Sequence, residues 1–190
     1  SAKDIDMKSE TMLTNNASVK AGNDVLLQAK TTLTNSGTVA ADKNITMQAD
    51  TLTNKGELTS SAGKAGVVHL DAATSLENTK AINGDKVELI STGTLNNSGA
   101  ITSADALLLQ AQNALQNTNK LTSANGQLEL ISATESITTS GTISGANINI
   151  KAAKKINSKG ALTAKDNIAI EAGEDIDNDG SMDARVINIK

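Results

Sequence analysis

Apolar residues recur in two short patterns that alternate along the whole chain. In the first pattern one position separates two apolar residues, and Ala or Ser follows two positions later, as in Val25, Leu27 and Ala29. Copies of this pattern begin at residues 5, 25, 45, 68, 87, 107, 128, 148, 168 and 187. Alternate side chains of a strand share a face, so each copy predicts a short β-strand with one apolar face.

The second pattern is built around a polar position, as in Leu33, Asn35, Val39 and Ala41. Its copies begin at residues 13, 33, 52, 76, 95, 115, 137, 156 and 176, and the step from the first apolar residue to the second is always six. The polar position is Asn in seven of the nine copies. This constant spacing indicates a rigid element that recurs in each repeat.

The repeat length of 19 to 24 residues favours stacked coils. It is too short for a helical repeat or a propeller blade, and equivalent strands recur in the same orientation. The sequence therefore predicts an all-β fold, a right-handed parallel β-helix (β-solenoid) with about 20 residues per coil and nine to ten coils. At ~4.8 Å per coil, the rod is roughly 45 Å long. Residues 1–190 form a single solenoid segment, which we expect to belong to a longer filament.

The repeat positions also predict what holds the coils together. Stacked apolar residues fill the interior, and the Ala, Ser or Gly positions mark corners. The Asn side chains stack and bond to one another or to the turn backbone. Glycines lie two residues past the Asn column at 37, 56, 99, 141, 160 and 180. We expect them to relieve a left-handed turn conformation.

Composition narrows the possible functions. The chain has no Trp, Tyr, Phe, Cys or Pro, and its net charge is -4. Disulfides and thiolate chemistry are excluded, and the mild, evenly spread charge does not indicate nucleic-acid binding. No apolar run approaches the ~20 residues of a transmembrane helix. We expect no cofactor.

Catalytic and metal-binding patterns are weak. Residues 175–180 (DIDNDG) resemble the start of a calcium loop, but Val186 stands where a bidentate Glu is required. The single histidine, His69, lies between inward Val68 and Leu70, so we expect it to face solvent. Acidic residues are scattered, and no aromatic ring is present to stack on a sugar. We predict no catalytic or metal-binding residues.

Two surface features are candidates for partner contact. Outward positions of the first pattern are mostly polar, yet Ile90, Leu108 and Ile131 fall on three consecutive coils in neighbouring columns. They predict a small exposed apolar patch. The joint from Leu58 to Val68 is ten residues long, whereas the others are five to seven. Its outward loop is the second candidate, with Ser61, Gly63, Lys64 and Gly66 as contact residues.

The repeat, seen as LTNSGTVAADKNITMQA at 33–49, resembles the repeats of filamentous haemagglutinins. These two-partner-secretion exoproteins include adhesins and the stalks of contact-dependent growth inhibition toxins. The resemblance covers essentially the whole chain and implies a right-handed β-helical filament. It also implies export through an outer-membrane partner transporter and a place on the bacterial surface or outside the cell. The Asn-Pro motifs of the family's secretion domain are absent, because the chain has no Pro.

The resemblance implies a stalk segment that presents adhesive or toxic modules and that adjoins further coils of the same protein. A face that itself binds a receptor or glycan is the alternative. A β-helical polysaccharide-active enzyme is a less favoured alternative. Neither the receptor nor the glycan is indicated by the sequence.

Overall fold

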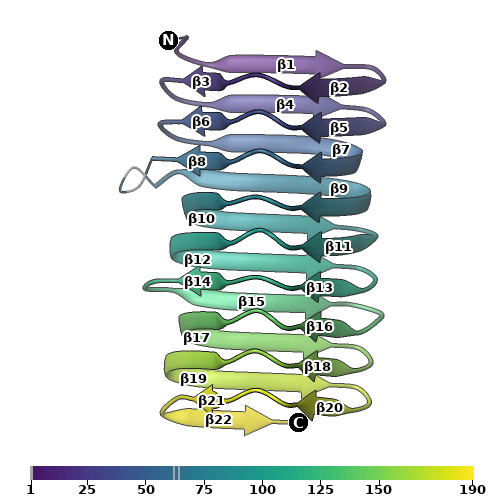
Figure 1. Cartoon of the computed structure of the whole chain (residues 1–190), viewed down its shortest axis with the longest axis vertical. Helices are drawn as coiled ribbons and strands as arrows, with labels where there is room; N and C mark the ends of the chain where they lie inside the picture. The colour runs from purple at the N-terminus through teal and green to yellow at the C-terminus, as the bar shows by residue number, and fades with distance from the viewer. Residues whose placement is uncertain (1, 62, 64) are drawn as a thin grey trace.

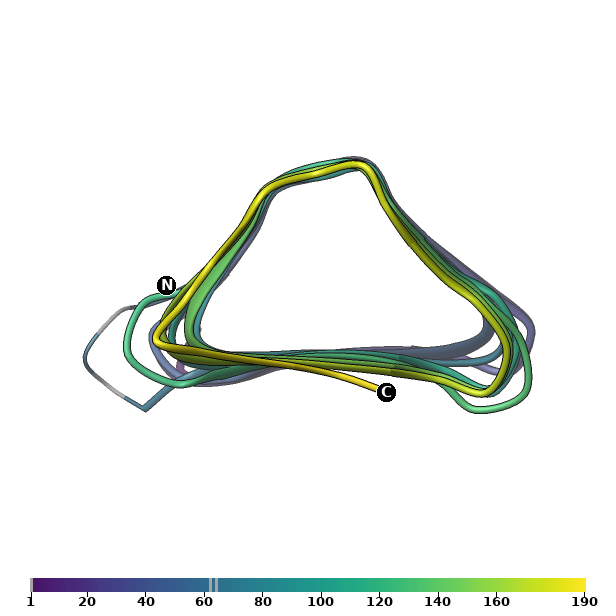
Figure 2. The same cartoon turned by 90° about the horizontal axis from the view of Figure 1, so that it is seen from below.

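The computed structural model describes residues 2–61, 63 and 65–190. This part of the chain contains 22 strands, joined by turns and bends, and no helix. Strands of successive coils pair in parallel and in register, and they stack into one elongated body (Figure 1). Viewed along its axis, the coil has a triangular outline with one long flat side (Figure 2). The predicted parallel β-solenoid is confirmed.

Each side of the triangle carries one part of the repeat. We call the flat side, formed by the first pattern, the base face. The strands confined to it are β1 (Ile5–Ser9), β4 (Val25–Ala29), β15 (Gln127–Ser132) and β22 (Val186–Ile189). The Asn face carries β2 (Met12–Asn15), β5 (Thr32–Asn35), β11 (Thr94–Asn97), β13 (Leu115–Asn117), β16 (Ile137–Thr139), β18 (Ile156–Ser158) and β20 (Ile176–Asn178).

The return face closes each coil. It carries β3 (Val19–Ala21), β6 (Val39–Ala41), β8 (Leu58–Ser60), β14 (Leu121–Ser123) and β21 (Met182–Asp183). The longer strands pass around a corner of the triangle, either from the return face onto the base face or from the base face onto the Asn face. They are β7 (Ile45–Asn54), β9 (Val67–Asn78), β10 (Ile82–Ser91), β12 (Ile101–Ala111), β17 (Ile143–Ala152) and β19 (Leu162–Ala172).

The coil is right-handed. In Figure 2 the C-terminal end faces the viewer, and the chain crosses the base face from left to right before it climbs over the apex. It therefore turns anticlockwise as it approaches the viewer. This is the hand expected for parallel crossover connections.

The interior is filled by aliphatic columns. Leu33 and Leu52 pair across adjacent coils, and both side chains are fully buried. The small residues of the pattern, such as Ala29 and Ala41, are buried at strand ends. The apolar part of the interior is thus built from Ala, Leu, Ile, Val and Met, without aromatic side chains.

The Asn column forms the predicted hydrogen-bonded ladder. Each Nδ2 donates to the Oδ1 of the next Asn at 2.7–2.8 Å, through Asn15, Asn35, Asn54, Asn78, Asn97 and Asn117. Several of these amides also donate to the carbonyl oxygen two residues later, as Asn97 does to Gly99 at 2.8 Å. The ladder then reaches Thr139 at 3.3 Å. A column of polar groups is therefore buried in the apolar interior with its hydrogen bonds made.

The expected role of the column glycines is wrong. Positive φ angles occur in the described residues only at Gly63 (79°) and Ala65 (55°), so the glycines past the Asn column do not adopt the left-handed conformation. A Cβ at Gly99 would instead overlap the Lys80 carbonyl oxygen of the preceding coil. Glycine is required here because the turns of adjacent coils stack backbone against backbone.

Candidate functional site

The predicted apolar patch lies on the base face. Leu108 pairs with Glu88 on one neighbouring coil and with Glu129 on the other, whereas Ile90 and Ile131 both pair with Gln110. Ile90 and Ile131 are therefore diagonal neighbours of Leu108, one on each adjacent coil. All three are partly exposed. The structure brings them to one surface, bordered by two carboxylates.

His69, Lys86 and Glu88 form a charged cluster next to this patch. The Glu88 carboxylate lies 2.6 Å from Lys86 Nζ and 3.1 Å from His69 Nδ1. The hydrogen bond from Lys86 holds the pKa of Glu88 below its ordinary value of 4.5. Partial burial opposes this shift, whereas the charge of Lys86 and the contact with His69 add to it. His69 therefore faces outward, as expected, but its side chain is only 26% exposed and contacts Glu88 of the next coil. The spacing could have indicated this pairing, since His69 and Glu88 occupy equivalent repeat positions.

A buried carboxylate anchors the predicted contact loop. Asp85 is 5% exposed, and it accepts hydrogen bonds from the backbone N–H of Gly63 at 2.9 Å and of Gly66 at 3.3 Å. Ser61 donates to Asp42 of the preceding coil at 3.3 Å. Lys64, also predicted for this loop, lies outside the described residues. Asp85 was not among the predicted residues, because the repeat pattern does not show the path that the inserted loop takes over the next coil.

The strand register is unaffected by the insertion. Ala41 pairs with Ser60 before it, and Ile45 pairs with Val68 after it. The extra residues are thus accommodated outside the stack, as expected for a solenoid loop.

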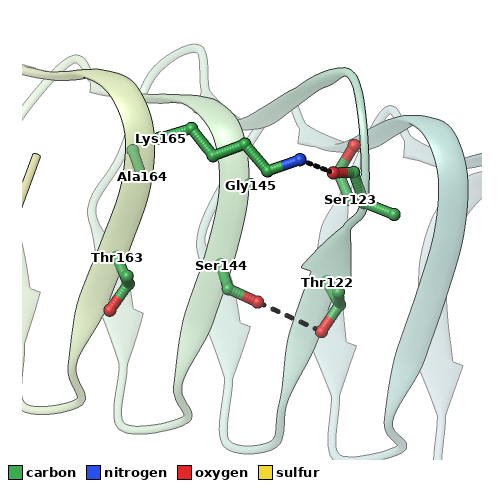
Figure 3. A pocket seen from close by; sticks show the side chains of 8 residues that line it. Thr122, Ser123, Ser144, Gly145, Thr163, Ala164 and Lys165 are labelled. Atoms are coloured by element: carbon green, nitrogen blue, oxygen red, sulfur yellow. Dashed lines mark hydrogen bonds between the residues drawn. The ribbon is translucent and has the colours of Figure 1, made fainter.

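A surface groove of about 400 Å³ crosses the return face at β14, β17 and β19 (Figure 3). Ser144 donates to the Thr122 hydroxyl at 3.2 Å. Lys165 passes over Gly145 and donates to the Ala124 carbonyl oxygen, two coils away, at 2.8 Å. The joint of the middle coil is five residues long, whereas those of its two neighbours are seven and six, so the middle coil has the least chain to cover this corner. These lengths were the signal in the sequence that could have predicted the groove.

The described residues hold no group of three His, Cys, Asp or Glu side chains arranged to bind a metal ion. At the calcium-like motif, Ile176 pairs in register with Ile156, and Asp175 faces Lys155 at 2.8 Å. His69 has no hydroxyl hydrogen-bonded to it in the described part of the chain, so no nucleophile–base pair is formed there. No helix able to cross a membrane is found among the described segments.

Comparison with known proteins identifies the repeat. A family model described as haemagglutinin repeat matches residues 4–80, 65–127 and 123–187. The chain belongs to the haemagglutinin repeat family. No curated protein and no solved structure matches it.

Haemagglutinin repeat proteins are secreted, surface-associated exoproteins, and the family is associated with two-partner secretion. The family is generally non-enzymatic. The β-solenoid and the haemagglutinin repeat together make this chain a filamentous haemagglutinin-like segment.

Proposed function

We propose that this chain is a rigid, non-enzymatic stalk segment of a bacterial surface exoprotein, holding adhesive or toxic modules away from the cell. The observation that carries the proposal is the unbroken register of the inward columns, from Ile5 to Ile187 and from Met7 to Ile189. Each coil is bonded to its neighbours on three faces, so bending has to disturb many hydrogen bonds and side-chain contacts together.

A distance measurement between two spin labels tests this rigidity. The chain has no cysteine, so Thr46→Cys and Ala169→Cys give two unique labelling sites in one outward column of the base face. Six coil steps at ~4.8 Å place their Cα atoms roughly 29 Å apart. We expect a narrow distance distribution in native buffer and a broad one in denaturant. A broad native distribution would contradict a rigid stalk.

We further propose that the segment continues into flanking coils of the same protein and reaches the surface through an outer-membrane partner transporter. Coils that pair only with neighbours can fold in succession as they emerge from a pore. Antibodies against this segment should label intact cells that have the transporter and should fail to label cells from which it is deleted. Equal labelling of both would contradict this route.

The apolar patch is proposed to contact a partner surface. Leu108→Lys places a charge at its centre, between Glu88 and Glu129, and should reduce adhesion or self-association without loss of fold. Leu26→Lys is the matched control, because Leu26 lies in the same outward column between Asp6 and Thr46. Unchanged association of the Leu108 variant, or an equal effect of both variants, would remove this role.

The loop anchored by Asp85 is proposed as a second contact site. Asp85→Ala removes the acceptor of the Gly63 and Gly66 amides, so amide exchange there should accelerate and any binding through the loop should weaken. Asp105→Ala, in the equivalent corner of the next coil, removes an exposed carboxylate and is the control. Faster exchange with unchanged binding would exclude the loop as a contact site.

Direct glycan binding is the second candidate function. The groove of Figure 3 favours it, because the hydroxyls of Thr122, Ser144 and Thr163 line one side of it. A glycan array probed with the isolated chain separates the two functions. Saturable binding that Thr163→Val weakens would support an adhesin face, and no binding would leave the stalk role.

A further inference from the structure

The chain contains two Asn-Gly sequences, Asn83-Gly84 and Asn125-Gly126. Both asparagine side chains are exposed, but their backbones differ. We propose that Asn125 is a site of spontaneous deamidation, in which water converts its side-chain amide to a carboxylate on the outside of the solenoid.

The reaction uses only the chain and water. The Gly126 backbone nitrogen attacks Cγ of Asn125, and a new C–N bond closes a five-membered succinimide. The bond from Cγ to the side-chain nitrogen breaks, and ammonia leaves with the Gly126 amide proton. Water then opens the ring at either carbonyl and gives aspartate or isoaspartate. The sum is one amide and one water converted to one acid and one ammonia.

The backbone at Asn125 leaves the attacking nitrogen free. Residues 124–126 form a bend between β14 and β15. The Asn125 N–H donates to the Ala104 carbonyl at 2.9 Å, and the Gly126 carbonyl accepts from Ala146 at 3.2 Å. The Gly126 N–H makes none of the hydrogen bonds found among the described residues. The nucleophile is therefore unprotected, although the bend is held on both sides of it.

The fold itself requires the glycine in this sequence. A Cβ at position 126 would overlap the Asp105 carbonyl oxygen of the preceding coil. The residue that makes an Asn-Gly sequence reactive is thus fixed by the stacking of the corners.

Asn83 is protected by its strand. Asn83 lies inside β10 and pairs with Thr59 on one side and with Thr102 on the other. An extended strand keeps the next backbone nitrogen away from Cγ, and pairing on both sides resists the rotation that would bring them together. Because both side chains are exposed and only the backbone at Asn83 is paired on both sides, Asn83 is an internal control.

The ladder asparagines are protected in a different way. Asn97, for example, is buried, and its amide donates to Asn117 and to the Gly99 carbonyl. Its Oδ1 accepts from Asn78. Burial limits the access of water to these groups, and rotation toward the next nitrogen would break the ladder.

Deamidation adds negative charge beside the groove. Lys165 Nζ is bonded to the carbonyl of Ala124, the residue that precedes Asn125 (Figure 3). A carboxylate at 125 adds an anion next to this bridge, and isoaspartate also lengthens the corner by one backbone atom. The product therefore alters the charge and shape at one edge of the groove.

Incubation of the full chain in mildly alkaline buffer, followed by peptide mass spectrometry, tests the proposal. We expect aspartate and isoaspartate at 125 to accumulate about tenfold or more faster than at 83, since local opening sets the reactivity of the strand site. In denaturant both sites should react at similar rates. The Asn125→Gln variant should keep the fold and lose the main product.

The deamidation rates of the native chain at residues 83 and 125 decide whether the proposal holds. Equal native rates at 83 and 125, or faster change at a ladder asparagine, would overturn the proposal. So would a native chain that stays unmodified at 125 while the denatured chain reacts there.

Discussion

Asn78 shows how many contacts one side chain makes in the ladder. Its Oδ1 accepts from Asn54 at 2.7 Å, and its Nδ2 donates to Asn97 at 2.8 Å and to the Lys80 carbonyl at 2.9 Å. Asn78→Ala leaves the buried Oδ1 of Asn97 without this donor, so we expect the unfolding free energy to fall by about 1–3 kcal/mol. Chemical denaturation measures this loss of unfolding free energy. Asn96→Ala, at an exposed position on the next coil, should cost less than about 0.5 kcal/mol, and equal losses would show that the ladder contributes nothing specific.

The ladder is incomplete near the C-terminal end, and this permits a gain-of-stability test. Ser158 is fully buried, and its hydroxyl and Asn178 Oδ1 both lack a hydrogen-bond partner in the described part of the chain. Ser158→Asn recreates the Asn-Lys-Gly sequence of residues 54–56 and supplies a donor to Asn178. We expect a gain of about 0.5–1.5 kcal/mol by thermal or chemical denaturation. A loss of stability would mean that this coil is too narrow for the larger side chain.

Glycine substitutions distinguish backbone stacking from turn conformation. Gly99→Ala places a methyl group against the Lys80 carbonyl, so we expect a loss of about 1–3 kcal/mol or more. At Gly22 the nearest atom to a new Cβ is the Ala2 carbonyl oxygen at 3.6 Å, an ordinary contact. Gly22→Ala should therefore be tolerated in the same denaturation assay. Tolerance of both substitutions would refute the close approach of the coils at Gly99.

At the scale of elements, ion pairs between neighbouring strands differ in how far solvent reaches them. Glu88 links β10 to His69 of β9, and its side chain is 21% exposed. Lys151 of β17 and Glu171 of β19 form a pair at 3.0 Å that is about half exposed. An exposed pair contributes little because water and salt screen it. The Glu88 cluster is therefore the better place to look for a dependence of stability on pH.

The lowered pKa of Glu88 sets the direction of that dependence. A carboxyl that is more acidic in the folded state stabilises the fold above its ordinary pKa of 4.5, and the contribution is lost as pH falls through the lowered folded pKa. Glu88→Gln should cost up to about 1 kcal/mol at pH 7 and progressively less below pH 4.5. Melting curves across pH measure the difference. With Glu171→Gln as the control, a Glu88 effect that grows on acidification would contradict this account.

The strands were predictable from sequence because their inward positions are constrained by two neighbours at once. Leu33 and Leu52 recur with a fixed six-residue step after them, and a slip of one residue would turn the whole apolar set outward. The corners obey no such constraint. The Asp85 anchor depends on the path of one inserted loop, and the requirement at Gly99 depends on a carbonyl contributed by another coil. Such contacts between coils are invisible in a single repeat.

At the scale of the whole molecule, a solenoid distributes stability by position along its axis. Each coil contacts only its neighbours, so a defect in the middle weakens two interfaces, whereas one at the end weakens a single interface. Leu76 is fully buried and pairs with Leu52 on one side and with Leu95 on the other. In the isolated chain, Leu13 lies in the first coil and is partly exposed, and its only strand pairing among the described residues is with Leu33.

Leu76→Ala should therefore divide the rod. The cavity is expected to cost about 2–5 kcal/mol, enough to separate the unfolding of the coils before and after it. Hydrogen exchange followed by mass spectrometry should show protection falling most in β7, β9 and β11, and less toward both ends. Leu13→Ala should lower protection only in β1, β2 and the adjoining β4 and β5. If both variants lowered protection evenly over all strands, the chain would be unfolding as one cooperative unit, and stiffness could not be assigned to individual coil interfaces.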